Sequence, residues 1–264
     1  MSTLFDLSEK VAIVTGGNRG IGKALALALA SHGADIIIAA RNQTKTAEAI
    51  KEIKKSYGVR VEGIEVDVLR EEQIIAMVKK AVEAFGKIDI LVNNSGIAEI
   101  KRPEDLTSEE WDRVLGTNLR GAFLCSKAAY PHLKAAGGGK IINIGSIASI
   151  FGCSLLPAYA ASKGGVVQLT KSLAVAWAAD NIQVNAILPG WYKTELGGGP
   201  KEPNAAYDKR ISSLTPMGRF GETHELGGAA IFLASHASDF ITGASIPVDG
   251  GYSVCLSALD GPFA

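Results

Sequence analysis

The chain has 264 residues, enough for one large α/β domain or two small ones, and 47% of them are hydrophobic, ample for a buried core. Its 27 basic and 27 acidic residues cancel to a formal net charge of zero and form no blocks of one sign. This balance excludes the basic footprint that nucleic acids or acidic membrane surfaces require.

The three cysteines are widely spaced, odd in number and without metal-ligand spacing, so we expect no metal site and a reducing compartment. The first ten residues hold no apolar signal core, and the apolar stretch 24–30 is too short to cross a bilayer. We therefore expect a cytoplasmic protein with no membrane or nucleic-acid partner.

Short β-branched runs alternate along the chain with longer helical patterns. Strands are predicted at 11–15, 35–40, 61–66, 88–94, 140–145, 182–188 and 244–248. Helices are predicted at 23–31, 44–57, 70–85, 109–136, 158–179 and 223–234. Several strands are apolar on both faces, which suits parallel strands covered by helices on each side. The alternation predicts one α/β domain over residues 1–264, a Rossmann-type, doubly wound sheet of seven parallel strands.

A glycine-rich sequence, TGGNRGIG, follows the first predicted strand and opens the first predicted helix. Gly16, Gly20 and Gly22 allow a tight turn and a close approach of the backbone to a pyrophosphate at the helix N-terminus. The spacing G-x-x-x-G-x-G fits the generic G-x-G-x-x-G fingerprint only loosely. It nevertheless predicts a dinucleotide site at this turn.

Two tyrosines precede a lysine by four positions, Tyr130 before Lys134 and Tyr159 before Lys163, and the spacing alone does not distinguish them. In an open parallel sheet, ligands bind beyond the carboxyl ends of the strands. The helix with Tyr130 runs back towards the amino edge, whereas Tyr159 follows Ser146 at the carboxyl end of the fifth strand. We therefore predict that Tyr159 and Lys163 react and that Tyr130 packs.

Several motifs together resemble the short-chain dehydrogenase/reductase family in its single-domain branch. They are the glycine loop, NNSG at 93–96, Asn118, Ser146 and the Tyr159–Lys163 pair. The likeness covers about Asp6 to Ser253 and implies an NAD(P)-dependent oxidoreductase. One departure is Ser95, where the family pattern usually has alanine; both residues are small.

The resemblance implies that Asn118, Ser146, Tyr159 and Lys163 form the catalytic set. A free tyrosine titrates near 10, and a nearby lysine ammonium is expected to lower the pKa of Tyr159. Tyr159 then exchanges a proton with the substrate oxygen, to which Ser146 also hydrogen-bonds. In the family, Lys163 also binds the nicotinamide ribose, and Asn118 holds a water that continues the proton relay.

The end of the second predicted strand bears on the choice of cofactor. An acidic residue there would accept from the 2′-hydroxyl of NAD, whereas Ala40 leaves room for a 2′-phosphate. Arg41 offers that phosphate a donor fork, and Arg19 a second contact. We expect NADP(H) to be preferred, with NAD(H) possible; the alternative is that both arginines are solvated surface residues.

Family positions extend the predicted cofactor site. Asp67 resembles the residue that contacts adenine, and Asn93 and Gly96 are expected under the adenosine ribose or in closing the fourth strand. PGWYKT at 189–194 resembles the motif that fixes the nicotinamide carboxamide. The predicted cofactor-binding residues are Gly16, Asn18, Arg19, Gly20, Ile21, Gly22, Arg41, Asn42, Asp67, Val68, Asn94, Ser95, Gly96, Tyr159, Lys163, Pro189, Gly190, Tyr192 and Thr194.

The segment 191–216 is long and glycine-rich for a connection, and we expect it to be a substrate lid. Residues 147–156, with Phe151 and Cys153, should form the opposite wall of the pocket. The stretch 218–253 resembles members that act on sugar acids and polyols, such as gluconate 5-dehydrogenases, which implies a small polar ketone or secondary alcohol. The lid cations that could meet a substrate carboxylate are Lys193, Lys201, Lys209 and Arg210.

Two other functions stay open. One is a 3-oxoacyl-[acyl-carrier-protein] reductase; Gly137 and Asp180 stand where such members present basic residues, so we expect no carrier docking. The other is a non-catalytic nucleotide-sensing protein, against which the complete catalytic set argues. The resemblance also implies a homotetramer, paired through the helices predicted at 109–136 and 158–179.

Overall fold

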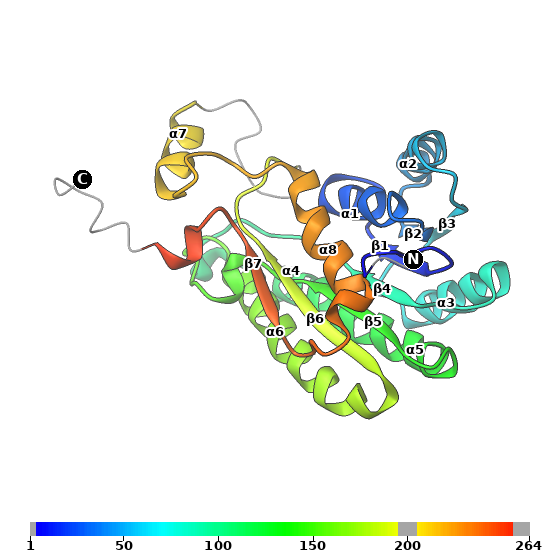
Figure 1. The fold of residues 1–264 in the computed structure, drawn as a ribbon. Coiled ribbons are helices and arrows are strands. Elements are labelled where there is room, and N and C mark those ends of the chain that lie inside the picture. Colours follow the sequence, from blue (N-terminus) through cyan, green and yellow to red (C-terminus); the bar gives the residue numbers. More distant parts are fainter. Residues whose placement is uncertain (1–3, 195–204, 256–264) are drawn as a thin grey trace.

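The computed structural model describes residues 4–194 and 205–255. Its seven strands are all parallel and form one sheet in the order β3-β2-β1-β4-β5-β6-β7 (Figure 1). The strands are β1 (Val11–Thr15), β2 (Asp35–Ala40), β3 (Val61–Glu65), β4 (Ile90–Asn93), β5 (Gly139–Ile144), β6 (Ile182–Pro189) and β7 (Ser245–Val248). The prediction of a doubly wound, seven-stranded parallel sheet is confirmed.

Helices cover both faces of this sheet (Figure 1). One face carries α1 (Gly20–Ala30), α2 (Gln43–Ser56) and α8 (Gly227–Ala234), whose buried residues form one apolar cluster. The other face carries α3 (Glu71–Phe85), α5 (Gly121–Ala135) and α6 (Pro157–Trp177), which form a second cluster. Short 3-10 turns are Pro103–Asp105, Ile147–Ser149, Ala178–Asp180, Thr223–Leu226, His236–Ser238 and Tyr252–Val254.

The central strands β1, β2 and β4 are mostly apolar because helices cover both of their faces, whereas the edge strands β3 and β7 are only partly buried. In β1, Val11 and Ile13 belong to the cluster with α3 and α5, while Ala12 and Val14 belong to the cluster with α1. Successive side chains of a strand point to opposite faces, so a strand between two helical layers needs an unbroken apolar run. The β-branched runs in the sequence have this physical cause.

The helix expected at 109–136 is interrupted. The structure has α4 (Ser108–Leu115), one π-helical turn at Gly116–Arg120, and then α5. Both glycines of this stretch pack closely: a Cβ on Gly116 would lie 2.9 Å from Leu69, and one on Gly121 would lie 3.1 Å from Val68. The π turn contains Asn118 and places its side chain inside the protein.

The expected lid also differs from a plain loop, because residues 205–214 form helix α7 (Ala205–Leu214). Tyr207, Ile211 and Leu214 are spaced to share one helical face, and Ile211 is buried. The sequence therefore contained a signal for this helix that the glycine content hid. Residues 195–204 of the predicted lid lie outside the described residues.

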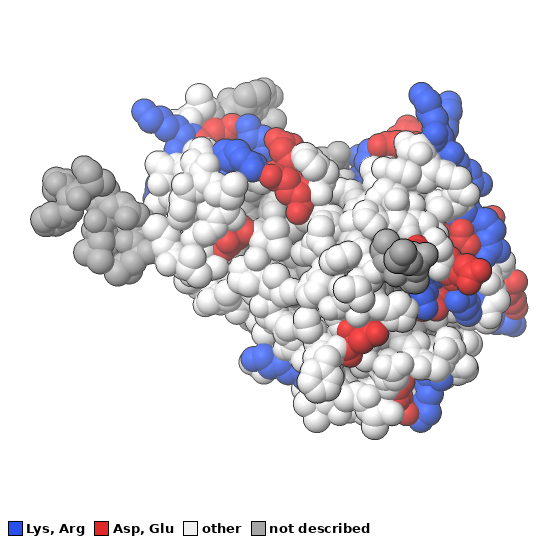
Figure 2. All heavy atoms as spheres, in the orientation of Figure 1, with Lys and Arg blue, Asp and Glu red and all other residues white. Residues whose placement is uncertain are grey.

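The surface charges are mixed. Figure 2 shows basic and acidic side chains next to each other around the edge of the molecule, for example over α7, and few charges over its middle. Within the part of the chain that the structure describes, no helix is long and apolar enough to cross a membrane.

Candidate active site

A cavity of about 680 Å³ opens at the carboxyl edge of the sheet, where β1 and β4 are neighbours although β2 and β3 separate them in sequence. Open α/β sheets bind ligands at this kind of switch in strand order. Every residue predicted to bind the cofactor lines the cavity. Of the predicted catalytic residues, Ser146, Tyr159 and Lys163 line it and Asn118 does not.

The glycine loop between β1 and α1 is built for close packing. Gly16 and Gly20 have φ of +64° and +50°, which favour glycine. A Cβ on Gly22 would lie 2.3 Å from the Gly16 carbonyl oxygen and 2.4 Å from Asn94 Nδ2. Asn94 Nδ2 donates to the Thr15 carbonyl at 2.9 Å, which ties this loop to the end of β4.

The N-terminus of α1 has the properties of a phosphate site. Its N-cap residue, Arg19, makes no side-chain cap, and its first turn holds no acidic residue. By contrast, the N-terminus of α2 is capped by Asn42, whose side chain accepts from the Lys45 N–H at 2.9 Å. The uncapped N–H groups and positive end of α1 border the cavity and fit the diphosphate of a dinucleotide.

The end of β2 forms the far end of the cavity. Ala40 is 7% exposed and brings no carboxylate there, and Arg19, Arg41 and Lys45 all line this end. The Asn18 side chain fixes the two loops together by donating to the Asn42 carbonyl at 3.1 Å. Lys45 was missed by sequence reasoning, although its position in the first turn after Arg41 could have indicated it.

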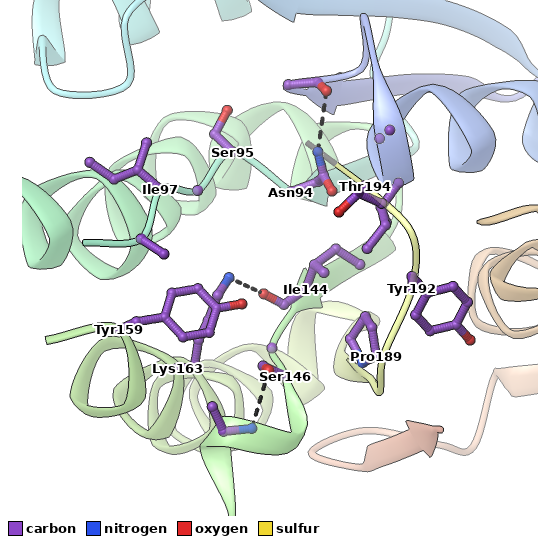
Figure 3. Close-up of a pocket in the computed structure, with 18 of the residues that line it drawn as sticks. Asn94, Ser95, Ile97, Ile144, Ser146, Tyr159, Lys163, Pro189, Tyr192 and Thr194 are labelled. Atoms are coloured by element: carbon purple, nitrogen blue, oxygen red, sulfur yellow. Dashed lines mark hydrogen bonds between the residues drawn. The ribbon is translucent and has the colours of Figure 1, made fainter. Parts of the chain in front are cut away.

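The predicted reactive groups meet in the middle of the cavity (Figure 3). Ser146 follows β5, and its hydroxyl accepts from the Ala148 N–H at 3.1 Å, which caps the short turn after the strand. Tyr159 lies in the first turn of α6, and its hydroxyl faces the same part of the cavity as that of Ser146 (Figure 3). A ketone oxygen that contacts one of these hydroxyls is therefore within reach of the other.

We expected the Lys163 ammonium to lower the pKa of Tyr159, but in the structure the pKa of Tyr159 is raised and Lys163 is not a cause of the shift. Its Nζ donates to the Ile144 carbonyl at 2.7 Å and lies 5.7 Å from the centroid of the Tyr159 ring. Burial raises the pKa of Tyr159, and the nearby Ser146 hydroxyl opposes that rise. Burial also lowers the pKa of Lys163 to about 8, because the ammonium is almost fully removed from water.

Asn118 lies behind the cavity wall. Its side chain accepts from the Ile97 N–H at 2.8 Å and donates to the Ile97 carbonyl and the Ser162 hydroxyl, each at 2.9 Å. Ser162 in turn donates to the Tyr159 carbonyl at 2.7 Å. A Cβ on Gly96 would lie 3.3 Å from Asn118 Oδ1 and 3.6 Å from Lys163 Nζ. Asn118 thus joins the loop after β4 to the helix that carries Tyr159.

Two other predicted residues direct their hydrogen-bonding groups away from the cavity: Asn93 does not line it, and Tyr192 lines it only with other atoms of its side chain or backbone. Asn93, expected under the ribose, is buried and donates to Asn143 Oδ1 at 2.8 Å and Ser126 Oγ at 2.9 Å. The Tyr192 ring is turned away from Tyr159, and its hydroxyl donates to the Val248 carbonyl at 2.9 Å (Figure 3). The Asn93 Nδ2 and Tyr192 hydroxyl donors thus find internal acceptors, whereas Asn93 Oδ1 is buried without a partner.

The second tyrosine–lysine pair lies near the amino ends of the strands, at the edge of the sheet opposite the cavity. Tyr130 donates to Asp180 at 2.7 Å and stacks on Trp177 with ring centroids 4.8 Å apart. Lys134 pairs with the same Asp180 at 2.8 Å. None of these groups lines the cavity.

Comparisons with known proteins find relatives that are similar over nearly the whole chain. A family model described as enoyl-(acyl carrier protein) reductase matches residues 16–253. The chain is 41% identical to the 2-dehydro-3-deoxy-D-gluconate 5-dehydrogenase of Bacillus subtilis, over 94% of this chain and 96% of that protein. It is 38% identical to the NAD-dependent glycerol dehydrogenase of Listeria innocua, over 95% and 96%.

A solved structure is similar over nearly the whole chain. It is a gluconate 5-dehydrogenase from Burkholderia cenocepacia, in complex with NADP and tartrate, with a TM-score of 0.91 and 39% identity. The match covers 96% of this chain and 98% of that one. Fold and site define an NAD(P)-dependent dehydrogenase acting on CH–OH groups. The chain belongs to the short-chain dehydrogenase/reductase family.

Proposed function

We propose that this protein interconverts a ketone and a secondary alcohol with NADP(H), and that Ser146, Tyr159 and Lys163 are its catalytic residues. The observation that carries the proposal is that Ser146, Tyr159 and Lys163 line the cavity that also contains the glycine loop. Chemistry on a carbonyl oxygen needs a proton donor and a second hydrogen-bond donor at one point, and the hydroxyls of Ser146 and Tyr159 supply both.

The cofactor, when bound, supplies or removes the hydride at the reacting carbon. Ser146 holds the substrate oxygen by a hydrogen bond, and Tyr159 gives it a proton in reduction or takes one in oxidation. Because burial raises the pKa of Tyr159, the phenol is protonated at neutral pH, which is the state that reduction needs. Oxidation needs the phenolate, so we expect its rate to rise with pH.

Asn118 belongs to this proposal as a positioning residue. The family resemblance gives it a bound water in a proton relay. Its contacts with Ile97 and Ser162 support a role in holding the loop after β4 against the turn of α6 that begins at Tyr159. Loss of Asn118 is therefore expected to lower kcat through the placement of Tyr159.

A preference for NADP(H) over NAD(H) is supported by the charges at the end of β2. Arg19, Arg41 and Lys45 line that end of the cavity, and Ala40 leaves it without a carboxylate to accept from a 2′-hydroxyl. Cations favour a 2′-phosphate, which carries two negative charges at neutral pH. A cytoplasmic location is part of the same proposal, supported by the free thiols of Cys125 and Cys153.

We propose a small, free substrate rather than an acyl chain on a carrier protein. The names of the relatives put sugar acids and polyols first among the candidates. Asp180, where the resemblance places a basic residue of carrier-dependent members, pairs with Lys134 at 2.8 Å just before β6 and does not line the cavity, so the proposal does not rest on its charge. Lys193, a candidate for a substrate carboxylate, instead pairs with Asp208 at 3.1 Å and does not line the cavity.

The test of the reaction is a matched pair of variants assayed for NADPH oxidation over a panel of ketones. We expect Tyr159→Phe to lose nearly all turnover while it still binds NADPH, because only the proton donor is removed. Tyr130→Phe should keep wild-type kinetics, because Tyr130 lies outside the cavity. Equal losses in the two variants would refute the assignment, and a wild type inactive on every ketone would favour the nucleotide-sensing alternative.

The test of the substrate size compares kcat/KM for free ketones with that for acetoacetyl groups, free and on acyl carrier protein. We expect the free small ketones to be better substrates. A carrier-bound acyl substrate that wins by about tenfold, about 1.4 kcal/mol of transition-state preference, would establish the 3-oxoacyl reductase alternative.

A further inference from the structure

The half of the cavity beyond Tyr159 is lined by apolar and aromatic side chains. They come from four separate segments, after β4, β5, β6 and β7, and include Ile100, Phe151, Leu156, Trp191, Leu214 and Tyr252. Among the described residues, the polar groups at this wall include the hydroxyls of Ser146 and Tyr159, which the reaction uses, that of Tyr252, and the buried indole N–H of Trp191, which has no hydrogen-bond partner. A surface of this kind gains free energy by covering carbon, not by binding hydroxyl groups.

The aromatic members of the wall hold one another in place. Phe151 meets Tyr252 edge-on with ring centroids 6.4 Å apart, and Tyr252 meets Trp191 edge-on at 6.2 Å. Trp191 also meets Tyr207 of α7 edge-on at 6.3 Å. Edge-to-face contacts at these distances are favourable, so the rings form a connected wall rather than independent side chains.

Apolar side chains also surround the opening of this half of the cavity. The loop after β4 and the loop before α6 are joined by the Lys101 N–H, which donates to the Leu155 carbonyl at 2.9 Å. On these loops Ile100, Phe151 and Leu155 are 48%, 40% and 46% exposed. Apolar side chains left this open around a cavity mark a surface that an apolar ligand covers.

Two lysines near the mouth are already paired with carboxylates of the protein. Lys101 pairs with Glu110 at 2.6 Å, and Lys193 pairs with Asp208 at 3.1 Å. The charged residues that line the cavity are Arg19, Arg41, Lys45, Asp67 and Lys163 among those described. All but Lys163 lie in the half formed by the segments around β1, β2 and β3, and Lys163 donates to the Ile144 carbonyl.

We propose that the substrate is an uncharged ketone, or the matching secondary alcohol, whose carbonyl is part of or next to an apolar alicyclic ring. The inference rests on the proposed function and narrows its substrate away from sugar acids. The carbonyl oxygen contacts Ser146 and Tyr159, and the ring covers Phe151, Trp191 and Tyr252. A carboxylate placed against these rings loses its hydration without an ionic partner.

The experiment compares two ketones of the same shape, 4-methylcyclohexanone and 4-oxocyclohexanecarboxylate, with the open-chain 5-keto-D-gluconate as a third substrate. We expect kcat/KM with NADPH to be highest for 4-methylcyclohexanone, by about tenfold or more over each of the other two, equivalent to about 1.4 kcal/mol. A carboxylate compound that equals or exceeds it overturns the inference and leaves the proposed function intact.

Variants of the wall give a second measurement. Phe151→Ala should lower kcat/KM for 4-methylcyclohexanone several-fold with the KM for NADPH unchanged, because the ring loses apolar contact. Phe240→Ala is the control, since Phe240 is fully exposed and does not line the cavity. Phe151→Arg should shift the preference towards 4-oxocyclohexanecarboxylate by offering a cation. The inference is contradicted if Phe151→Ala keeps the wild-type kcat/KM for 4-methylcyclohexanone and Phe151→Arg keeps the wild-type preference between the two ketones.

Binding separates the inference from the proposed reaction. We expect calorimetric titration of Tyr159→Phe, saturated with NADPH, to show tighter binding of 4-methylcyclohexanone than of 4-oxocyclohexanecarboxylate. If the wild type reduces no ketone, the proposed reaction is wrong, and these two affinities still decide the inference. Equal affinities, or tighter binding of the carboxylate, overturn it.

Discussion

The two tyrosine–lysine pairs show how one local geometry gives two environments. Nζ of Lys163 lies 5.7 Å from the Tyr159 ring, and Nζ of Lys134 lies 5.8 Å from the Tyr130 ring, as helical spacing dictates. Yet burial lowers the pKa of Lys163 to about 8, whereas the hydrogen bond to Asp180 raises the pKa of Lys134. Only the surroundings of the helix differ between the pairs.

Burial of Lys163 is expected to cost stability. Its folded pKa of about 8 lies below the ordinary value of 10.5, so between these values the unfolded chain binds more protons and the free energy of unfolding rises with pH. We expect Lys163→Met to abolish turnover but to raise the free energy of unfolding at pH 7 by about 1–3 kcal/mol. Urea denaturation of the wild type and the variant at pH 7, 8.5 and 10 measures the change in the free energy of unfolding and its dependence on pH, and a standard assay measures turnover.

The control for this prediction is Lys134→Met, which removes an exposed lysine of the same spacing. We expect it to change stability little and to leave the pH dependence between 8 and 10 intact. A Lys163→Met protein less stable than wild type at pH 7 would show that the hydrogen bond to Ile144 outweighs the desolvation of the ammonium.

The cofactor preference is also decided by single residues. We expect a lower KM for NADPH than for NADH, and Ala40→Asp with Arg41→Ile should reverse it, because the new carboxylate repels a 2′-phosphate and accepts from a 2′-hydroxyl. Initial rates with both cofactors measure this. Lys45→Met, which leaves Ala40 and Arg41 unchanged, should weaken the NADPH preference without reversing it. A wild type that prefers NADH would make the arginines ordinary surface residues.

At the scale of elements, the N-terminus of α1 depends on the absence of a Cβ at Gly22. The Gly16 carbonyl and Asn94 both lie within 2.4 Å of that position, so Gly22→Ala must move the helix or the loop. We expect a loss of about 1–3 kcal/mol in the free energy of unfolding and a KM for NADPH raised more than about tenfold. Denaturant melts and steady-state kinetics measure the two effects.

Gly228 in α8 is the matched control, because no atom lies within 4 Å of its Cβ position. Gly228→Ala should raise the free energy of unfolding by up to about 1 kcal/mol, since alanine lowers the entropy of the unfolded chain, and leave kinetics unchanged. Should both glycine variants keep normal NADPH binding, the close approach at Gly22 has no part in cofactor recognition.

At the scale of the whole molecule, we propose that residues 1–264 form one catalytic domain, because the described strands make one sheet, and that four copies assemble. The helices expected to pair carry exposed apolar side chains: Trp111 on α4, Phe123 on α5 and Val175 on α6 are 36%, 41% and 84% exposed. Pairing would bury them in a closed, symmetric interface. Light scattering at micromolar concentration should give four times the chain mass, and a monomer mass would contradict the proposal.

The Phe123→Glu and Val175→Glu variants sharpen this test. Each places a charge on the proposed interface, so we expect smaller assemblies with unchanged secondary structure by circular dichroism. The Phe240→Ala protein should keep the wild-type mass if α5 and α6 form the interface. Dissociation caused by Phe240→Ala alone would place the interface elsewhere.

The order of elements and the cofactor half of the cavity could be predicted from the sequence. Apolar runs and the glycine loop are local patterns, and parallel strands place their carboxyl ends at one edge, so Ser146 and Tyr159 were expected together before the structure. Local patterns did not reveal that the Tyr192 ring turns towards β7 or that Asn93 binds Asn143. The partners of both residues lie about 50 residues away in the chain.

The sequence by itself determined the fold and the family and predicted which side chains meet in the cavity, because strand periodicity and short motifs are properties of neighbouring residues. The tertiary structure alone decided that Asn118 lies behind the cavity wall, that Lys163 titrates near 8 and that Phe151, Trp191 and Tyr252 form one wall. Burial and ring contacts arise between segments far apart in the chain. Spacing carries no information about how much water such contacts exclude.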